Sequence, residues 1–268
     1  MMRFVATLVV ALSVGLTLPP AAIRAENTPA PASATAPAEP DAKALLLRMA
    51  DFLGKTKAFS VNIDAVYDVM QPTGQKIEFG EVRRVLIDRP DRLRVQSEMS
   101  NGEKLTMYFD GKTFTMFSPR ENVFTKLEKP GSVDSVIKFI VQDLQTPIPL
   151  SMMLLASVKD QLEKRVTEVD FVEQTSIAGK PVDHLAARTD DVDFQVWVAQ
   201  GARPLPLRVV ITYDFAEGQP QFSADLNDWN LAPKIEEAAF AFSVPAGAQA
   251  IRLMVALPNV VAAKRREQ

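Results

Sequence analysis

Residues 92–117 read RLRVQSEMSNGEKLTMYFDGKTFTMF, and this stretch decides the fold. Apolar and polar residues alternate along residues 92–99 and again along 105–109, as they do in a β-strand with one buried and one solvent-exposed face. Asp110-Gly111 then predicts a two-residue hairpin, because such turns need positive φ angles. Together with the flanking residues, the pattern predicts an antiparallel meander without a helix from Gln75 to Leu127. Such a meander forms a wide curved sheet.

The rest of the chain adds helices at two places and more strands. Residues 41–54 have helical periodicity, with Asp41 as N-cap and Gly54 at the end. A second helical region, residues 133–166, is divided by Pro147-Ile148-Pro149. The first residues after this division, 150–155, are apolar on nearly every side of the predicted helix. They must therefore be buried or face a ligand. Alternation precedes the meander at residues 61–69 and returns from Val169 onward, which predicts one α+β domain of about ten or eleven antiparallel strands.

The amino terminus predicts export. Arg3 is followed by the uncharged apolar stretch from Phe4 to Leu18, and small residues suited to a signal peptidase precede Ala25. We predict a signal peptide over residues 1–25, with cleavage after Ala22 and retention as an anchor as the alternatives. The stretch is shorter than the roughly 20 residues that a membrane-spanning helix needs, so we expect no stable membrane insertion after cleavage.

The predicted organisation follows from composition. Residues 26–40 are almost entirely Ala, Pro, Thr, Ser and Glu, which predicts a disordered leader. We place the folded domain at residues 41–250 and a carboxy-terminal tail at residues 251–268. The chain of 268 residues has no cysteine, so its fold has no disulfide and no lipid can be attached at the cleavage site.

The charge balance argues against a nucleic-acid partner. The formal net charge is −3, and removing residues 1–25 deletes two arginines and no acid. A phosphate backbone requires a concentrated positive face. Basic residues do gather at five positions, which we interpret as a solvated face whose arginines pair with nearby acids such as Glu81, Asp88 and Glu98. The five positions are Arg83, Arg84, Arg89, Arg92 and Arg94.

The residue types that carry common catalytic and metal chemistry are missing or misplaced. The chain has one histidine, His184, in a predicted strand and without a Gly-x-Ser-x-Gly elbow, so we interpret it as structural. Residues 110–113 imitate the end of a phosphate-binding loop but lack its first glycine and its helix. One histidine and no cysteine leave no soft metal site. We therefore expect no cofactor and no enzymatic activity.

Several segments resemble a family of predicted periplasmic proteins. They are residues 89–95 (RPDRLRV), 108–114 (YFDGKTF), Ser118-Pro119, 204–208 (PLPLR), 228–231 (DWNL) and 240–247 (FAFSVPAG). The resemblance spans about Ala44 to Ile251 and implies a periplasmic location. More distantly, the pattern is similar to the lipoprotein-carrier superfamily typified by LolA and LolB. That similarity implies an incomplete, or half, antiparallel β-barrel closed by a helical lid over an apolar cavity for acyl chains.

Under this resemblance, the insert is the lid and the meander is the wall beneath it. We predict twelve cavity residues from the wall and the lid: Leu93, Val95, Leu105, Met107, Phe109, Phe114, Met116, Ile137, Ile140, Val141, Met152 and Met153. The implied partner is a lipid or the acyl chain of a lipoprotein. The alternative is an envelope interaction module whose cavity is filled by its own side chains, with a protein complex as partner.

Overall fold

The fold is built around one open sheet, seen in a computed structural model that describes residues 40–146 and 148–252. The predicted signal peptide, nearly all of the leader and most of the tail lie outside these residues, so those predictions remain predictions. The strands are β1 (Ala58–Met70), β2 (Lys76–Asp88), β3 (Arg92–Met99), β4 (Lys104–Phe109), β5 (Thr113–Ser118), β6 (Val123–Glu128), β7 (Val166–Ile177), β8 (Lys180–Thr189), β9 (Asp193–Ala199), β10 (Pro206–Thr212), β11 (Gln221–Asn230) and β12 (Gln249–Ala250).

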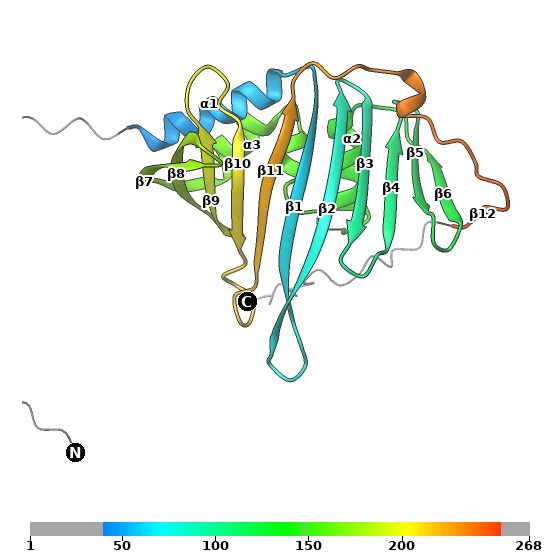
Figure 1. Cartoon of the computed structure of the whole chain (residues 1–268), viewed down its shortest axis with the longest axis horizontal. Helices are drawn as coiled ribbons and strands as arrows, with labels where there is room; N and C mark the ends of the chain where they lie inside the picture. Colours follow the sequence, from blue (N-terminus) through cyan, green and yellow to red (C-terminus); the bar gives the residue numbers. More distant parts are fainter. Residues whose placement is uncertain (1–39, 147, 253–268) are drawn as a thin grey trace, which may run out of the picture. The chain divides into compact units, whose positions relative to one another are not determined.

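The sheet joins two meanders. Its order is β12-β6-β5-β4-β3-β2-β1-β11-β10-β9-β8-β7, and every neighbouring pair is antiparallel except β12 with β6. Figure 1 shows β1 and β11 side by side near the middle, where the two meanders meet. The ends of this order are not paired with each other within the described ranges, so the barrel is incomplete. The predicted helix-free meander and half-barrel class are confirmed.

Two details of the predicted sheet differ from the structure. The sheet has twelve strands, because the two residues of β12, too few to show alternation, pair with β6. The predicted Asp110-Gly111 turn is shifted by one residue. Phe109 pairs with Phe114, and the Asp110 carboxylate accepts from the backbone N–H groups of Lys112 and Thr113 at 3.0 and 2.7 Å. That side chain closes the turn and leaves Gly111, with φ 86°, at its first central position.

The sheet has an inner face that packs on α1 and the insert and an outer face that packs on neither. Inner-face residues of the central strands, such as Val61, Ile63, Val85 and Ile87, are at most 4% exposed. Helix α1 (Ala42–Lys55) and four shorter helical segments complete the core on that side. Figure 1 shows α2 (Val133–Lys138) behind β2 and β3.

Helix α1 begins as predicted. The Asp41 carboxylate accepts a hydrogen bond from the Ala44 N–H at 2.9 Å, which satisfies one of the free donors of the first turn. The helix continues one residue past Gly54. A Cβ at Gly54 would lie 2.6 Å from the carbonyl oxygen of Ala156, so the glycine allows the insert to approach the helix closely.

We expect Gly54→Ala to lower the free energy of unfolding by about 1 kcal/mol. The clash with a backbone oxygen costs about 1–3 kcal/mol, which outweighs the roughly 1 kcal/mol by which alanine favours a helix. Urea denaturation measures the difference. Gly80→Ala is the matched control, because the nearest atom to its added Cβ is 3.7 Å away. An equal effect at the two positions would contradict this role of Gly54.

The insert between β6 and β7 is less regular than predicted. It contains α2 (Val133–Lys138), a π-helical turn (Phe139–Asp143), a 3-10 turn (Ser151–Leu154) and α3 (Val158–Arg165). The predicted helix over residues 150–166 is therefore wrong in its first half. Leu150 adopts a left-handed conformation, with φ 66°, and Leu155 is extended. Asp134 explains the break, since its carboxylate accepts from the N–H groups of Ala156 and Ser157 and pins the start of α3 to α2.

The carboxy-terminal segment crosses the outer face. Phe242 lies 5.1–5.7 Å, between ring centroids, from Tyr108, Phe117 and Phe124. Phe240 is 1% exposed beneath the guanidinium of Arg92. This segment (residues 231–250) covers the outer face of β4, β5 and β6. The alternation of apolar and polar residues alone predicts that side chains on this face are exposed to solvent.

Candidate functional site

The sheet register places the seven predicted wall residues on one face. Leu93, Phe109 and Phe114 form one row across β3, β4 and β5. Val95, Met107 and Met116 form the next row, and Leu105 lies opposite Ser97 in the row after it. These rows belong to the inner face, which packs against the insert. Whether they enclose a ligand cavity remains a prediction.

The five predicted lid residues approach the same face from the insert. Ile137 and Ile140 are 5% and 3% exposed and belong to the core. Val141, Met152 and Met153 are half-buried and pack against that core. The sequence predicts that residues 150–155 of the insert are buried or face a ligand. The two methionines of this segment are half-buried in the structure.

Burial falls along the inner face from one end to the other. In the row of Leu93, Phe109 and Phe114, every side chain is at most 5% exposed. In the next row Met107 and Met116 are half-buried, as is Leu105 beyond them. The core is thus filled beside the β2–β3 turn and opens toward the β1–β2 hairpin.

The same gradient appears on β2. Ile87 and Val85 are 0% and 3% exposed, whereas Phe79 and Ile77, near the hairpin, are 39% and 37% exposed. All four lie on the inner face, because they alternate along the strand. In Figure 1 the β1–β2 hairpin extends beyond the neighbouring strands, which agrees with the exposure of these two side chains in the described part of the chain.

A buried ion pair lies between the two ends. Arg83 donates to the Glu81 carboxylate through Nε at 2.7 Å and through Nη2 at 2.6 Å, and the two side chains are only 12% and 4% exposed. Arg83 also donates through Nη1 to the carbonyl oxygen of Pro149 at 3.0 Å. Its guanidinium lies 5.7 Å from the ring centroid of Phe222. A charged pair on the inner face therefore holds the insert.

Arg89 also donates a hydrogen bond to a backbone carbonyl of the insert. Its Nη2 donates to the carbonyl oxygen of Leu154 at 2.8 Å, and its guanidinium lies 5.5 Å from the ring centroid of Phe59. Burial lowers the pKa of Arg89, and attraction by Asp134 opposes that shift. Arg83 in β2 and Arg89 just after it thus bind two backbone carbonyls of the insert, one shortly before the 3-10 turn and one at its last residue.

Aromatic side chains gather at the open end. Tyr67 stacks on Phe79 with centroids 6.1 Å apart, and Tyr213 meets Phe215 edge-on at 6.3 Å. Burial raises the pKa of Tyr213, an effect that Arg83 opposes. Burial and the nearby Glu81 charge raise the pKa of Tyr67. Both phenols therefore stay neutral near pH 7 and can donate a hydrogen bond.

The predicted solvated basic face is wrong for two of its five arginines. Arg89 is buried and the Arg83 side chain is only 12% exposed, although the predicted pairing of Arg83 with Glu81 and of Arg92 with Asp88 is confirmed. The sequence held a signal, because Glu81 and Arg83 share the alternation of Val85 and Ile87. Their partners Pro149 and Leu154 lie more than sixty residues away, which alternation does not reveal.

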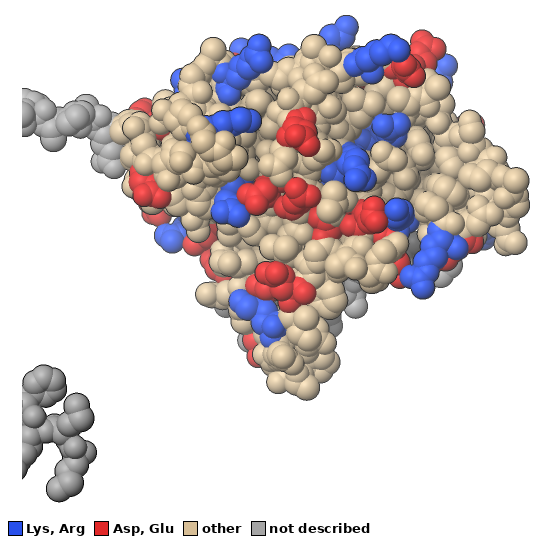
Figure 2. Space-filling model, viewed as in Figure 1, with Lys and Arg blue, Asp and Glu red and all other residues tan. Residues whose placement is uncertain are grey.

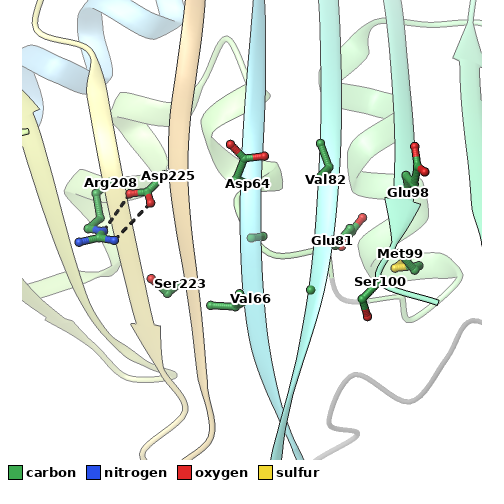
Figure 3. A pocket seen from close by; sticks show the side chains of 12 residues that line it. Asp64, Val66, Glu81, Val82, Glu98, Met99, Ser100, Arg208, Ser223 and Asp225 are labelled. Carbon is green, nitrogen blue, oxygen red and sulfur yellow. Dashed lines mark hydrogen bonds and ion pairs between the residues drawn. The ribbon is translucent and has the colours of Figure 1, made fainter. Parts of the chain in front are cut away.

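A hollow of about 550 Å³ lies on the opposite, outer face of the sheet. Its floor includes Gly80, Ser100 and Ser223, whose small size leaves the space (Figure 3). Asp64 and Asp225 lie opposite each other on β1 and β11, and Arg208 binds Asp225 at 2.9 Å. Figure 2 shows acidic and basic side chains interspersed on this face of the sheet. None of the twelve predicted cavity residues lines this hollow.

The described residues contain no group of three or more His, Cys, Asp or Glu side chains placed to hold a metal ion. Within the same ranges, no helix is both long and apolar enough to cross a membrane. His184 lies in β8, stacked at 3.9 Å between centroids on Trp197, and its Nε2 lies 3.0 Å from Oε1 of Gln195. These contacts support the structural interpretation of this histidine.

Solved structures with a similar fold come from several bacteria, at low identity. Lipoprotein LppX of Mycobacterium tuberculosis is 13% identical, with a TM-score of 0.46, and the match covers 74% of this chain and 100% of that one. LprF of Mycobacterium bovis is 12% identical, with a TM-score of 0.48, over 78% and 98% of the two chains. A LolA superfamily protein of Nitrosomonas europaea is 14% identical, with a TM-score of 0.37, over 75% and 97%.

No curated protein matches the chain. A family model does match it, over residues 42–254, which include every described helix and strand. Its description is that of a predicted periplasmic protein, in agreement with the resemblance noted in the sequence. The chain therefore belongs to the DUF2092 family of predicted periplasmic proteins.

Proposed function

We propose that this protein is a non-enzymatic carrier that binds an acyl chain of a lipid or lipoprotein between the inner face of the sheet and the insert. The signal peptide of residues 1–25 is removed during export to the periplasm. The twelve predicted residues of wall and lid form the site, with the buried ones as its base and the half-buried ones in contact with the acyl chain.

The half-buried methionines carry this proposal. Met107 and Met116 on the sheet and Met152 and Met153 on the insert lie against a buried core, yet none of them is itself buried. Methionine is unbranched and polarizable, so it adapts to apolar partners of variable shape. Ligand sites for apolar molecules are lined mainly by such side chains, with few polar groups.

The insert supports the proposal through its irregular backbone. Between α2 and α3 it has one π-helical and one 3-10 turn, and a left-handed Leu150. Arg83 and Arg89 hold its carbonyls through single hydrogen bonds. Such a segment can move without the loss of a regular helix, which admits a chain from the open end.

The test is lipid content followed by binding. Protein purified from the periplasmic fraction should carry lipid in native mass spectrometry, and the delipidated protein should bind a fluorescent C16 fatty acid saturably at one site. The same protein denatured in urea is the control for non-specific uptake. Absence of both copurified lipid and fatty-acid binding would reject the carrier and favour the envelope module with a filled core.

A further inference from the structure

The two edges of the sheet differ in whether another strand covers their backbone groups. At one edge, β12 covers part of β6 through hydrogen bonds from Gln249 N to Asn122 O at 3.0 Å and from Ile251 N to Phe124 O at 2.8 Å. At the other edge, β7 pairs with β8 alone within the described ranges. Figure 1 shows β7 as the last strand at that end. Among residues 40–146 and 148–252, no strand therefore pairs with the outer edge of the twelve-residue strand β7.

Strand β7 is protected by acidic side chains and a bulge, but not by lysine or proline. Natural edge strands commonly carry lysine or proline, which hinder pairing with another chain. Residues 166–177 read VTEVDFVEQTSI and contain neither of them, nor arginine. Val172 is 49% exposed, so an apolar side chain also stands in solvent here.

A bulge in β7 arranges its acids in one row. Glu168, Asp170 and Glu173 do not alternate evenly, but the register shifts between Phe171 and Glu173. The three acids therefore lie opposite Arg188, Ala186 and His184, which are alternate residues of β8. A bulge that accommodates one extra residue has placed all three carboxylates on the outer face.

The inner face of the same strand is apolar. Val169 lies opposite Ala187 and Phe171 opposite Leu185, and both β7 side chains are half-buried at the end of the core. An added strand would therefore meet free backbone groups, carboxylates on one face and apolar side chains on the other.

We propose that β7 binds an extended segment of another protein in which basic residues alternate with apolar ones, as an added antiparallel strand. Lysine or arginine side chains of that segment pair with the carboxylate row, and its apolar side chains continue the inner face. Main-chain hydrogen bonds supply affinity in this mode and alternate side chains supply specificity. This surface is separate from the acyl site, so it does not depend on the proposed carrier function.

The row of carboxylates favours a basic segment over a second copy of β7 and over an anionic membrane surface. Two copies of β7 paired antiparallel about Phe171 and Val172 would place Asp170 opposite Glu173, and like charges directly opposite destabilise a sheet. An anionic membrane surface would be repelled by the same row. A basic alternating segment satisfies both faces at once.

The first experiment titrates a fluorescein-labelled peptide of alternating lysine and valine into the purified protein and follows anisotropy. We expect saturable binding that weakens as salt rises from 50 to 500 mM, and no binding of the peptide with glutamate in place of lysine. Two further peptides carry N-methyl groups on alternate residues, one along each edge. Only one edge of an added strand donates to β7, so one methylated peptide should bind and the other should not.

The second experiment changes the protein. Asp170→Lys with Glu173→Lys should weaken binding of the lysine peptide by about tenfold or more. Glu78→Lys with Glu98→Lys is the control, because it makes the same charge change at other exposed acids of the outer face. If the lysine pair fails to fold, Asp170→Asn with Glu173→Gln serves instead. Equal effects of the two methylated peptides, equal loss in the control, or dimers paired through β7 in sedimentation and cross-linking would each overturn the proposal.

Discussion

Glu81→Leu is expected to lower the free energy of unfolding by about 3–5 kcal/mol, because it leaves the buried Arg83 guanidinium without its carboxylate. The double variant Glu81→Leu with Arg83→Met should recover most of that loss, since replacing a buried ion pair by apolar residues of similar volume is often neutral. Urea denaturation, followed by tryptophan fluorescence and circular dichroism, gives the three free energies.

The control for this prediction is an exposed pair on the same sheet. Glu98 and Lys104 are 3.3 Å apart with side chains 41% and 55% exposed, so Glu98→Leu should cost less than about 1 kcal/mol. If Glu81→Leu were as mild as Glu98→Leu, the pair at Glu81 would not be the buried interaction described above. If the double variant were the least stable of all, the Arg83 contact with Pro149 would dominate over the ion pair.

The second large effect concerns ligand binding and rests on the proposed carrier function. Met107→Asp with Met116→Asp should weaken fatty-acid binding by about a hundredfold or more. An uncompensated carboxylate covered by an acyl chain loses its water, which costs several kcal/mol, and about 2.7 kcal/mol corresponds to a hundredfold. Because both methionines are half-buried in the free protein, their carboxylates can reach solvent there and the fold should survive. Fluorescence titration with the C16 probe measures the loss.

Val66→Asp is the matched control for the methionine variants. Val66 is 37% exposed on the outer face and lines the hollow there, so an added carboxylate should leave fatty-acid binding unchanged. Circular dichroism melts of all variants separate lost binding from lost structure. Unchanged affinity in a folded Met107→Asp/Met116→Asp variant would contradict binding on the inner face, and loss in Val66→Asp would move the site to the outer hollow.

Alternation in the sequence predicted the sheet well because each strand obeys a local rule. Leu93, Val95 and Met107 share a face in the structure for the reason that predicts it, a side-chain period of two. The same rule assigned Glu81 and Arg83 to the inner face, but the general preference of charges for solvent argued against it. Their burial depends on Pro149 and Phe222, and neither is near them in sequence.

The less regular parts depended on contacts that no local pattern encodes. The insert breaks where Asp134 binds the backbone of Ala156 and Ser157, so the periodicity of residues 150–166 could not give its true boundaries. Likewise, the apolar residues Phe240 and Phe242 are evident in the sequence, but their partners on the outer face belong to β3–β6. The bulge at Val172 is a departure from alternation and is found only through the register with β8.

The central pairing of the sheet has a consequence for the order of folding. Strand β1 lies between β2, which follows it in sequence, and β11, whose partner residue Asn230 is 170 positions after Ser60. A chain that emerges amino terminus first can form the hairpin of β1 and β2 early, but it must keep one side of β1 unpaired until residues 221–230 arrive. Closing so long a loop is slow, and a waiting strand can pair with the wrong chain. The unpaired side of β1 is therefore the place where an incomplete chain is most open to wrong pairing.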